Sequence, residues 1–120
     1  MKKINLVFIC LFLFLSFSKS FAQEIIPLNE NMEIKLNEKD SQQLNFVFDI
    51  GQLKFNSELN AQRYFAAISD NLTNYKVDFD SKKVTLKLLV KNLPTIWSIE
   101  DWNNYFLKKQ SRYVSYYKGI

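Results

Sequence analysis

The chain has 120 residues, of which 16 are Lys or Arg and 12 are Asp or Glu, so its formal net charge is +4. It contains one cysteine, Cys10, and no histidine. This composition excludes an internal disulfide, a Ser-His-Asp triad and a zinc site built from the usual histidine and cysteine ligands.

The first 22 residues predict a secretory signal peptide that is cleaved from the mature protein. Lys2 and Lys3 form a basic start, an apolar stretch follows over residues 4–17, and Ser20 and Ala22 place small side chains at the −3 and −1 positions. The alternative is an uncleaved anchor, but a membrane-spanning helix needs about 20 apolar residues and this stretch is shorter. We therefore expect an exported protein, periplasmic or secreted, that has no membrane contact after cleavage. Its signal peptide and its Lys-, Asn- and Phe-rich composition are typical of a bacterial protein.

Cleavage would also remove most of the surplus positive charge. Residues 1–22 carry three lysines and no acidic residue, which leaves 13 basic residues against 12 acidic ones and a net charge of +1. Nucleic-acid binding requires a dense basic surface, so we expect no nucleic-acid partner. Cys10 is lost as well, and a secreted domain of about a hundred residues without disulfides must rely on its hydrophobic core.

Residues 23–43 are predicted to form a polar arm or a leading edge strand. Their one strand-like feature is an alternation of apolar and charged residues over 32–36. Apolar side chains then occupy every second position over 44–50, which predicts a strand with one apolar face. Asn56 or Ser57 can cap the next element, because their side-chain oxygens accept hydrogen bonds from free backbone N–H groups.

A helix is predicted over residues 58–72, where Ala61, Phe65, Ile68 and Leu72 recur at helical spacing and form one apolar face. Two alternating runs follow, over 75–79 and 84–90, and a short polar turn joins them. This pattern predicts a β-hairpin.

A second helix is predicted to begin after Ser98, its N-cap. Asp101 stands at the position of a capping-box carboxylate, and Trp97 and Trp102 occupy the two positions of a hydrophobic staple. Residues 113–117 are rich in strand formers, so we expect a short last strand there. The alternative is that the helix continues to the C-terminus.

The resulting order, β-α-β-β-α-β, predicts an α+β fold for residues 44–120. Two interleaved right-handed crossovers give a ferredoxin-like sandwich, a four-stranded antiparallel sheet with both helices on one face.

Two stretches resemble the heavy-metal-associated domain family, which includes copper chaperones. Ser57 to Ile68 has the rhythm of the family's first helix, which follows a Cys-x-x-Cys motif, and Val77 to Leu86 is similar to its central hairpin. The resemblance extends over residues 44–117 and implies the ferredoxin-like fold. In that family the two thiolates bind soft metal ions, above all copper(I).

Carried over by position, the two cysteines of the motif fall on Ser57 and Asn60. Copper(I) selects thiolate and thioether ligands, so a hydroxyl and an amide suit it poorly. Met32, the one methionine after the signal peptide, supplies a single sulfur. The resemblance therefore implies the fold without its metal site, and we expect no metal and no cofactor. The favoured interpretation makes Ser57 and Asn60 cap and first-turn residues; in the alternative, their loop presents a binding surface.

Other polar and aromatic residues leave two interpretations open. Asp78 and Asp80 lie two residues apart, with Asp49 on another strand, but interspersed lysines favour a solvated face over an acid/base pair. The tyrosines are too many to bury at one end of a small sandwich. They form either an exposed aromatic patch, typical of a binding surface, or a partly buried set with hydroxyls in water. They are Tyr64, Tyr75, Tyr105, Tyr113, Tyr116 and Tyr117.

No catalytic residue is predicted. The leading hypothesis is an exported, non-catalytic module that binds a protein partner or itself, through a helix-and-loop surface or an exposed sheet edge. The alternative is a weak metal-ion or small-ligand binding protein of the cell envelope that uses the Ser57–Asn60 loop and nearby carboxylates. An enzyme that uses only carboxylates and tyrosine ranks third, because the two glycines provide no phosphate-binding loop.

Overall fold

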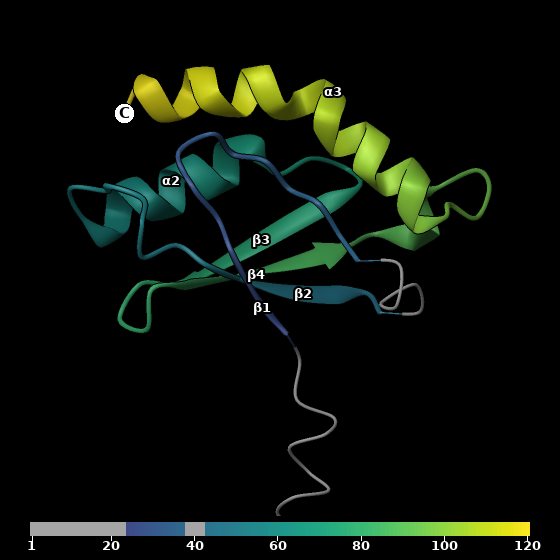
Figure 1. The fold of residues 1–120 in the computed structure, drawn as a ribbon, viewed down its shortest axis with the longest axis horizontal. Coiled ribbons are helices and arrows are strands. Elements are labelled where there is room, and N and C mark those ends of the chain that lie inside the picture. The colour runs from purple at the N-terminus through teal and green to yellow at the C-terminus, as the bar shows by residue number, and fades with distance from the viewer. Residues whose placement is uncertain (1–23, 38–42) are drawn as a thin grey trace, which may run out of the picture.

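A four-stranded mixed sheet carries two α-helices on one face in the computed structural model, which describes residues 24–37 and 43–120 (Figure 1). The predicted signal peptide, residues 1–22, lies outside the described residues. The elements are β1 (Ile25–Pro27), β2 (Asn45–Asp49), α2 (Glu58–Ile68), β3 (Thr73–Asp78), β4 (Lys83–Leu88), the 3-10 helix η2 (Val90–Asn92) and α3 (Ile99–Lys118).

The sheet order is β1-β2-β4-β3. β3 and β4 form the predicted antiparallel hairpin, and β2 pairs antiparallel with β4. The predicted α+β class with two helices is therefore confirmed. The prediction of a fully antiparallel sheet is wrong, because β1 pairs with β2 in the parallel direction.

The expected last strand over residues 113–117 is also wrong, because α3 continues through it to Lys118. Tyr113 and Tyr117 are four residues apart and therefore lie on the same side of a helix. Tyr113 is buried, and the Tyr117 ring packs edge-on against Phe55 and Tyr64. Burial of these rings in the helical arrangement overrides the strand propensity of the local sequence.

α2 ends at Ile68, four residues before the predicted end. The Ser69 hydroxyl donates to the carbonyl of Phe65 and accepts from the backbone N–H of Tyr75. Oδ1 of Asp70 then accepts from the backbone N–H groups of Leu72 and Thr73 at 2.8 and 2.9 Å. These hydrogen bonds stabilise a turn at the point where the helix would otherwise continue, and β3 then begins at Thr73.

The segment after β1 crosses the helix-bearing side of the sheet and runs beside α3 (Figure 1). We call residues 28–37 the arm. The predicted alternation over 32–36 is present, with the apolar side chains buried and the charged ones exposed, although these five residues belong to no strand of the described sheet. The side chain of Asn103 on α3 both donates to and accepts from the backbone of Leu36, and Gln110 donates to the carbonyl of Asn31.

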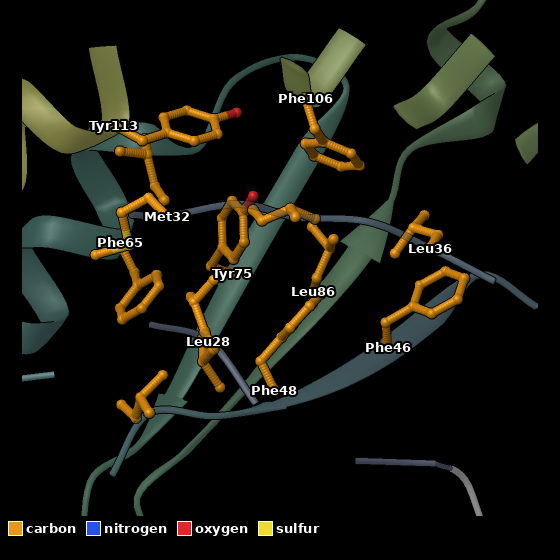
Figure 2. Packing of buried hydrophobic residues seen from close by; sticks show 14 of the residues in the cluster. Leu28, Met32, Leu36, Phe46, Phe48, Phe65, Tyr75, Leu86, Phe106 and Tyr113 are labelled. Carbon is orange, nitrogen blue, oxygen red and sulfur yellow. The ribbon is translucent and has the colours of Figure 1, made fainter. Parts of the chain in front are cut away.

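One hydrophobic core lies between the sheet and the layer formed by the two helices and the arm. Figure 2 shows side chains from all three parts converging: Met32 and Leu36 from the arm, Phe46 and Leu86 from the sheet, and Phe106 from α3. The opposite face of the sheet carries no helix in the part of the chain that the structure describes (Figure 1).

Candidate functional site

An apolar groove of about 470 Å³ opens at the end of the sheet where β2 begins and β4 ends. Figure 1 shows the 93–98 loop projecting there, beside the first turn of α3. The groove is lined by Gln43, Leu44, Leu88, Val90, Lys91, Leu93, Pro94, Thr95, Ile96, Trp97, Ile99 and Trp102. Its volume falls within the range of about 300–1,000 Å³ that is usual for ligand sites.

The local sequence fixes one wall of this groove. The Ser98 side chain accepts from the backbone N–H of Asp101 at 3.2 Å, and Oδ2 of Asp101 accepts from the backbone N–H of Ser98 at 2.9 Å, so the predicted capping box is confirmed. The predicted staple is present too, since the rings of Trp97 and Trp102 meet edge-on with centroids 4.9 Å apart. Cap and staple together set the angle at which the 93–98 loop enters α3.

Large apolar side chains remain in solvent around the groove. Ile96 is 99% exposed, Leu44 is 43% exposed and Val90 is 40% exposed. Single exposed apolar residues are ordinary, but several around one concavity mark an interaction surface.

Lys91 on η2 is the one charged residue among the lining residues. The remaining lining residues are uncharged.

Ser57 and Asn60 lie at the opposite end of the sheet, near the end of β2. Ser57 is the N-cap of α2, and its side-chain oxygen accepts from the backbone N–H of Asn60 at 3.2 Å. The interpretation of this pair as cap and first-turn residues is confirmed.

These residues do not fit a copper(I) site. The Ser57 oxygen already serves the helix, and Met32, the one thioether among the described residues, is buried in the core. Over residues 24–37 and 43–120, no three His, Cys, Asp or Glu side chains gather as metal ligands.

The carboxylates lie on the open face of the sheet. The strand register places Lys83 of β4 opposite Asp49 of β2 on one side and opposite Asp78 of β3 on the other. Asp80 lies beyond the end of β3, in the hairpin turn. A lysine lies between the two strand carboxylates in the register and offsets part of their charge, which supports a solvated face.

The tyrosines form no single exposed patch, and that interpretation is wrong. Tyr64, Tyr75 and Tyr113 are buried, Tyr105 and Tyr117 are half-buried, and Tyr116 alone of the six is exposed. The alternative, partial burial with hydroxyls in water, is also wrong for the three buried rings, of which Tyr64 donates to the carbonyl of Tyr113 at 2.8 Å. Burial raises the pKa of all three buried phenols.

Neither edge of the described sheet offers a long free strand. On β3, the N–H of Thr73 bonds to Asp70 and the N–H of Tyr75 bonds to Ser69, so both are used within the chain. β1 has three residues and ends at Pro27, which has no N–H. Short and blocked edges oppose strand addition by a partner.

Comparison with known proteins gives no match, either among protein-family models or among curated proteins and solved structures. No helix within the described ranges has the length and apolar character needed to cross a membrane.

Reasoning from sequence missed the groove, although it identified Trp97, Ser98, Asp101 and Trp102 as parts of a helix start. The available signal was the run of residues 93–97, Leu-Pro-Thr-Ile-Trp, in which large apolar residues stand between two predicted elements. Of these, Leu93 and Trp97 pack partly against the core, whereas Ile96 stays exposed.

Proposed function

We propose that the chain is an exported, non-catalytic binding module whose groove receives an apolar side chain of a protein partner. The observation that carries this proposal is the almost complete exposure of Ile96 on the rim of an apolar groove. Burial of apolar surface is the main favourable term in most protein association, and Ile96 is the most exposed of the large apolar side chains in the described part of the chain.

A protein partner fits the groove better than a small ligand does. A small molecule could fill the space between Leu44, Leu93 and Trp97, but Ile96 points into solvent and would stay there. A protein surface covers the groove and Ile96 together. The blocked edges of β3 and β1 favour the groove over strand addition as the route of binding.

The fold belongs to the same proposal. The three antiparallel strands β2, β4 and β3, with α2 and α3 on one face, correspond to most of a ferredoxin-like sandwich. We propose that β1 replaces the last strand of that fold at the edge next to β2. Kinship with the heavy-metal-associated family stays a prediction.

The binding test uses protein purified from the envelope of an expressing bacterium, so that its N-terminus is the one that the cell produces. The protein is immobilised as wild type, as Ile96→Glu and as Leu107→Glu, which makes the same change at a leucine of α3 that is 66% exposed and outside the groove. Captured envelope proteins are identified, purified and titrated individually.

We expect a partner whose affinity falls at least about tenfold with Ile96→Glu, because a buried charge would replace a buried apolar group. Leu107→Glu should leave that affinity unchanged. Partners that bind all three proteins equally would contradict the proposal. The intact mass of the same preparation tests export, since it should lack residues 1–22.

A further inference from the structure

We propose that the part of the partner that enters the groove is an extended peptide segment in which an Asp or Glu side chain stands beside a large apolar one. This inference rests on the proposed function and names the chemistry of the partner. In this arrangement the apolar side chain lies in the hollow, the carboxylate faces Lys91, and the peptide backbone passes over Ile96.

The charge of the groove selects an acidic segment. Lys91 is exposed and is the one charged residue among the lining residues. It forms no ion pair with any other described residue. A carboxylate placed against its ammonium group is attracted, whereas a second cation is repelled. Such charge complementarity decides between partners more than it adds affinity.

The size of the groove selects a short segment instead of a folded surface. Twelve residues line the groove, whereas a stable interface between folded proteins uses about 20–30 residues on each side. The volume of about 470 Å³ is in the range of sites that enclose a small ligand. One large side chain and its nearest neighbours therefore suit this site, and a buried apolar anchor of this kind supplies most of the energy of a small interface.

The loop beside the groove favours a peptide over a fatty acid. The backbone N–H groups of Thr95 and Ile96 donate to no other described residue, and both residues are exposed. A peptide segment that crosses this loop carries carbonyl groups that accept from such donors. A fatty acid could fill the hollow and pair with Lys91, but its hydrocarbon chain has no acceptor for these N–H groups.

Selection from a library of random peptides displayed on phage identifies the preferred segment. The envelope-purified protein is immobilised as wild type, as Lys91→Glu and as Lys108→Glu, which makes the same change of charge at an exposed lysine of α3 outside the groove. With the wild type and with Lys108→Glu, we expect enriched peptides in which Asp or Glu stands beside a large apolar residue. With Lys91→Glu, the enriched charged residue should change to Lys or Arg.

Titration of the most enriched peptide measures each contact. The peptide is synthesised with both ends blocked, so that its side chains are the one source of carboxylate. Its dissociation constant should rise about tenfold with Lys91→Glu, because repulsion replaces attraction, and should not change with Lys108→Glu. Ile96→Ser should raise it about fivefold, since it removes an apolar contact without a change of charge.

A neutral twin of the peptide, with Asn or Gln in place of the acidic residue, isolates the charge contact. The twin should bind the wild type and Lys91→Glu equally, because the contact that the substitution disrupts is already absent. Lys91, Ile96 and Lys108 are exposed, so we expect all variants to be folded, and far-UV circular dichroism verifies this.

The outcomes separate this inference from the proposed function. Enriched peptides that are apolar without an acidic bias, and that depend on Ile96, would overturn the acidic segment and retain the groove as a binding site. Equal weakening by Lys91→Glu and Lys108→Glu would also overturn it, because the response would then be to overall charge.

Two further outcomes would count against a peptide of any kind. If no peptide is enriched, or if dodecanoate binds in a Lys91-dependent way and no peptide does, the inference is wrong. The capture of envelope proteins by wild type and by Ile96→Glu then decides the proposed function separately. Failure to find either a peptide or an envelope protein that depends on Ile96 would overturn both.

Discussion

The two ends of the sandwich both carry clusters of buried and half-buried aromatic rings, but an apolar groove opens beside one of them, and we call the other the covered end. At the end where α2 begins, Phe55, Tyr64, Phe65 and Tyr117 pack with ring centroids 5.1–5.9 Å apart. The Tyr117 hydroxyl accepts from the backbone N–H of Lys54 at 2.7 Å, and it donates to Glu30 of the arm at 3.3 Å. At the other end Trp97, Trp102 and Tyr105 pack together, but the groove beside them stays open.

From this difference we expect the covered end to stabilise the fold and the open end to bind a partner. At the covered end, segments far apart in the sequence hold the rings, so a substitution there should unfold the protein. At the open end, a local cap and staple hold the loop, so a substitution on the rim should alter binding alone. The predictions below test this contrast, from the largest expected effect on stability to the smallest.

Phe65→Ala should reduce the free energy of unfolding by about 3–5 kcal/mol, because Phe65 is fully buried and its loss leaves a cavity. Urea denaturation measures the change. Leu59→Ala on the same helix is the control, since Leu59 is half exposed, and it should cost far less. Equal losses for the two variants would show that burial of Phe65 in the covered cluster does not stabilise the protein.

High pH should destabilise the covered end. Burial raises the pKa of Tyr113 from 10.0 to about 12, so the unfolded chain loses this proton at a lower pH than the folded chain does. The free energy of unfolding should therefore be unaffected by Tyr113 below pH 10 and should fall as the pH rises from about 10 to about 12.

Tyr113→Phe should make this decrease shallower, because it removes one of the phenols whose pKa burial raises. The Tyr113 hydroxyl makes no hydrogen bond of ordinary geometry among the described residues, but it does interact with the buried Tyr75 hydroxyl, and the substitution removes this interaction as well. Urea denaturation at several pH values measures both slopes. If the free energy of unfolding fell as steeply with pH in Tyr113→Phe as in the wild type, Tyr113 would not be a source of the pH dependence.

Ser98→Ala should reduce the free energy of unfolding by about 1 kcal/mol, because it removes half of the capping box at the open end. Ser57→Ala should cost less, since Ser57 caps α2 through a single bond. Thermal denaturation compares the two, and Ser98→Asn, which keeps an acceptor, should restore most of the loss. A larger cost for Ser57→Ala would reverse the assigned roles of the two caps.

Ile96→Ser should change the free energy of unfolding by less than about 0.5 kcal/mol, because the side chain makes almost no contact within its own copy. Urea denaturation measures this change. A loss above about 1 kcal/mol would mean that Ile96 stabilises its own chain and is not a free binding group.

The parts of the fold that depend on residues close together in the sequence could be predicted from the sequence. The hairpin of β3 and β4, the start of each helix and the Trp97–Trp102 staple follow from periodicity and cap chemistry within a few residues. The C-terminal part of α3 could not be predicted in this way. Its strand-forming residues are helical because, in a helix, Tyr113 and Tyr117 pack against residues from other parts of the chain.

The parallel edge strand and the groove were beyond prediction for the same reason. β1 has three residues, which is too short to show the alternation of apolar and polar residues that identifies a strand. Its position depends on pairing with β2, about twenty residues later in the chain. The groove consists of surface left uncovered where Leu44, Val90 and Ile96 meet, segments whose proximity only the assembled sheet creates. In contrast, the roles of Ser57 and Asn60 at the start of α2 were predictable, because a cap is a local feature.

The position of the arm also controls when the protein can finish folding. Its bonds to α3 join Leu36 to Asn103, Asn31 to Gln110 and Glu30 to Tyr117, residues separated by 67, 79 and 87 positions. Contacts of such high sequence separation are slow to form, because a long loop must close before they stabilise anything. The arm therefore waits for the last helix before it can pack. Residues 25–28 can pair with β2 earlier, so we expect the packing of residues 30–36 against α3 to be among the last steps of folding.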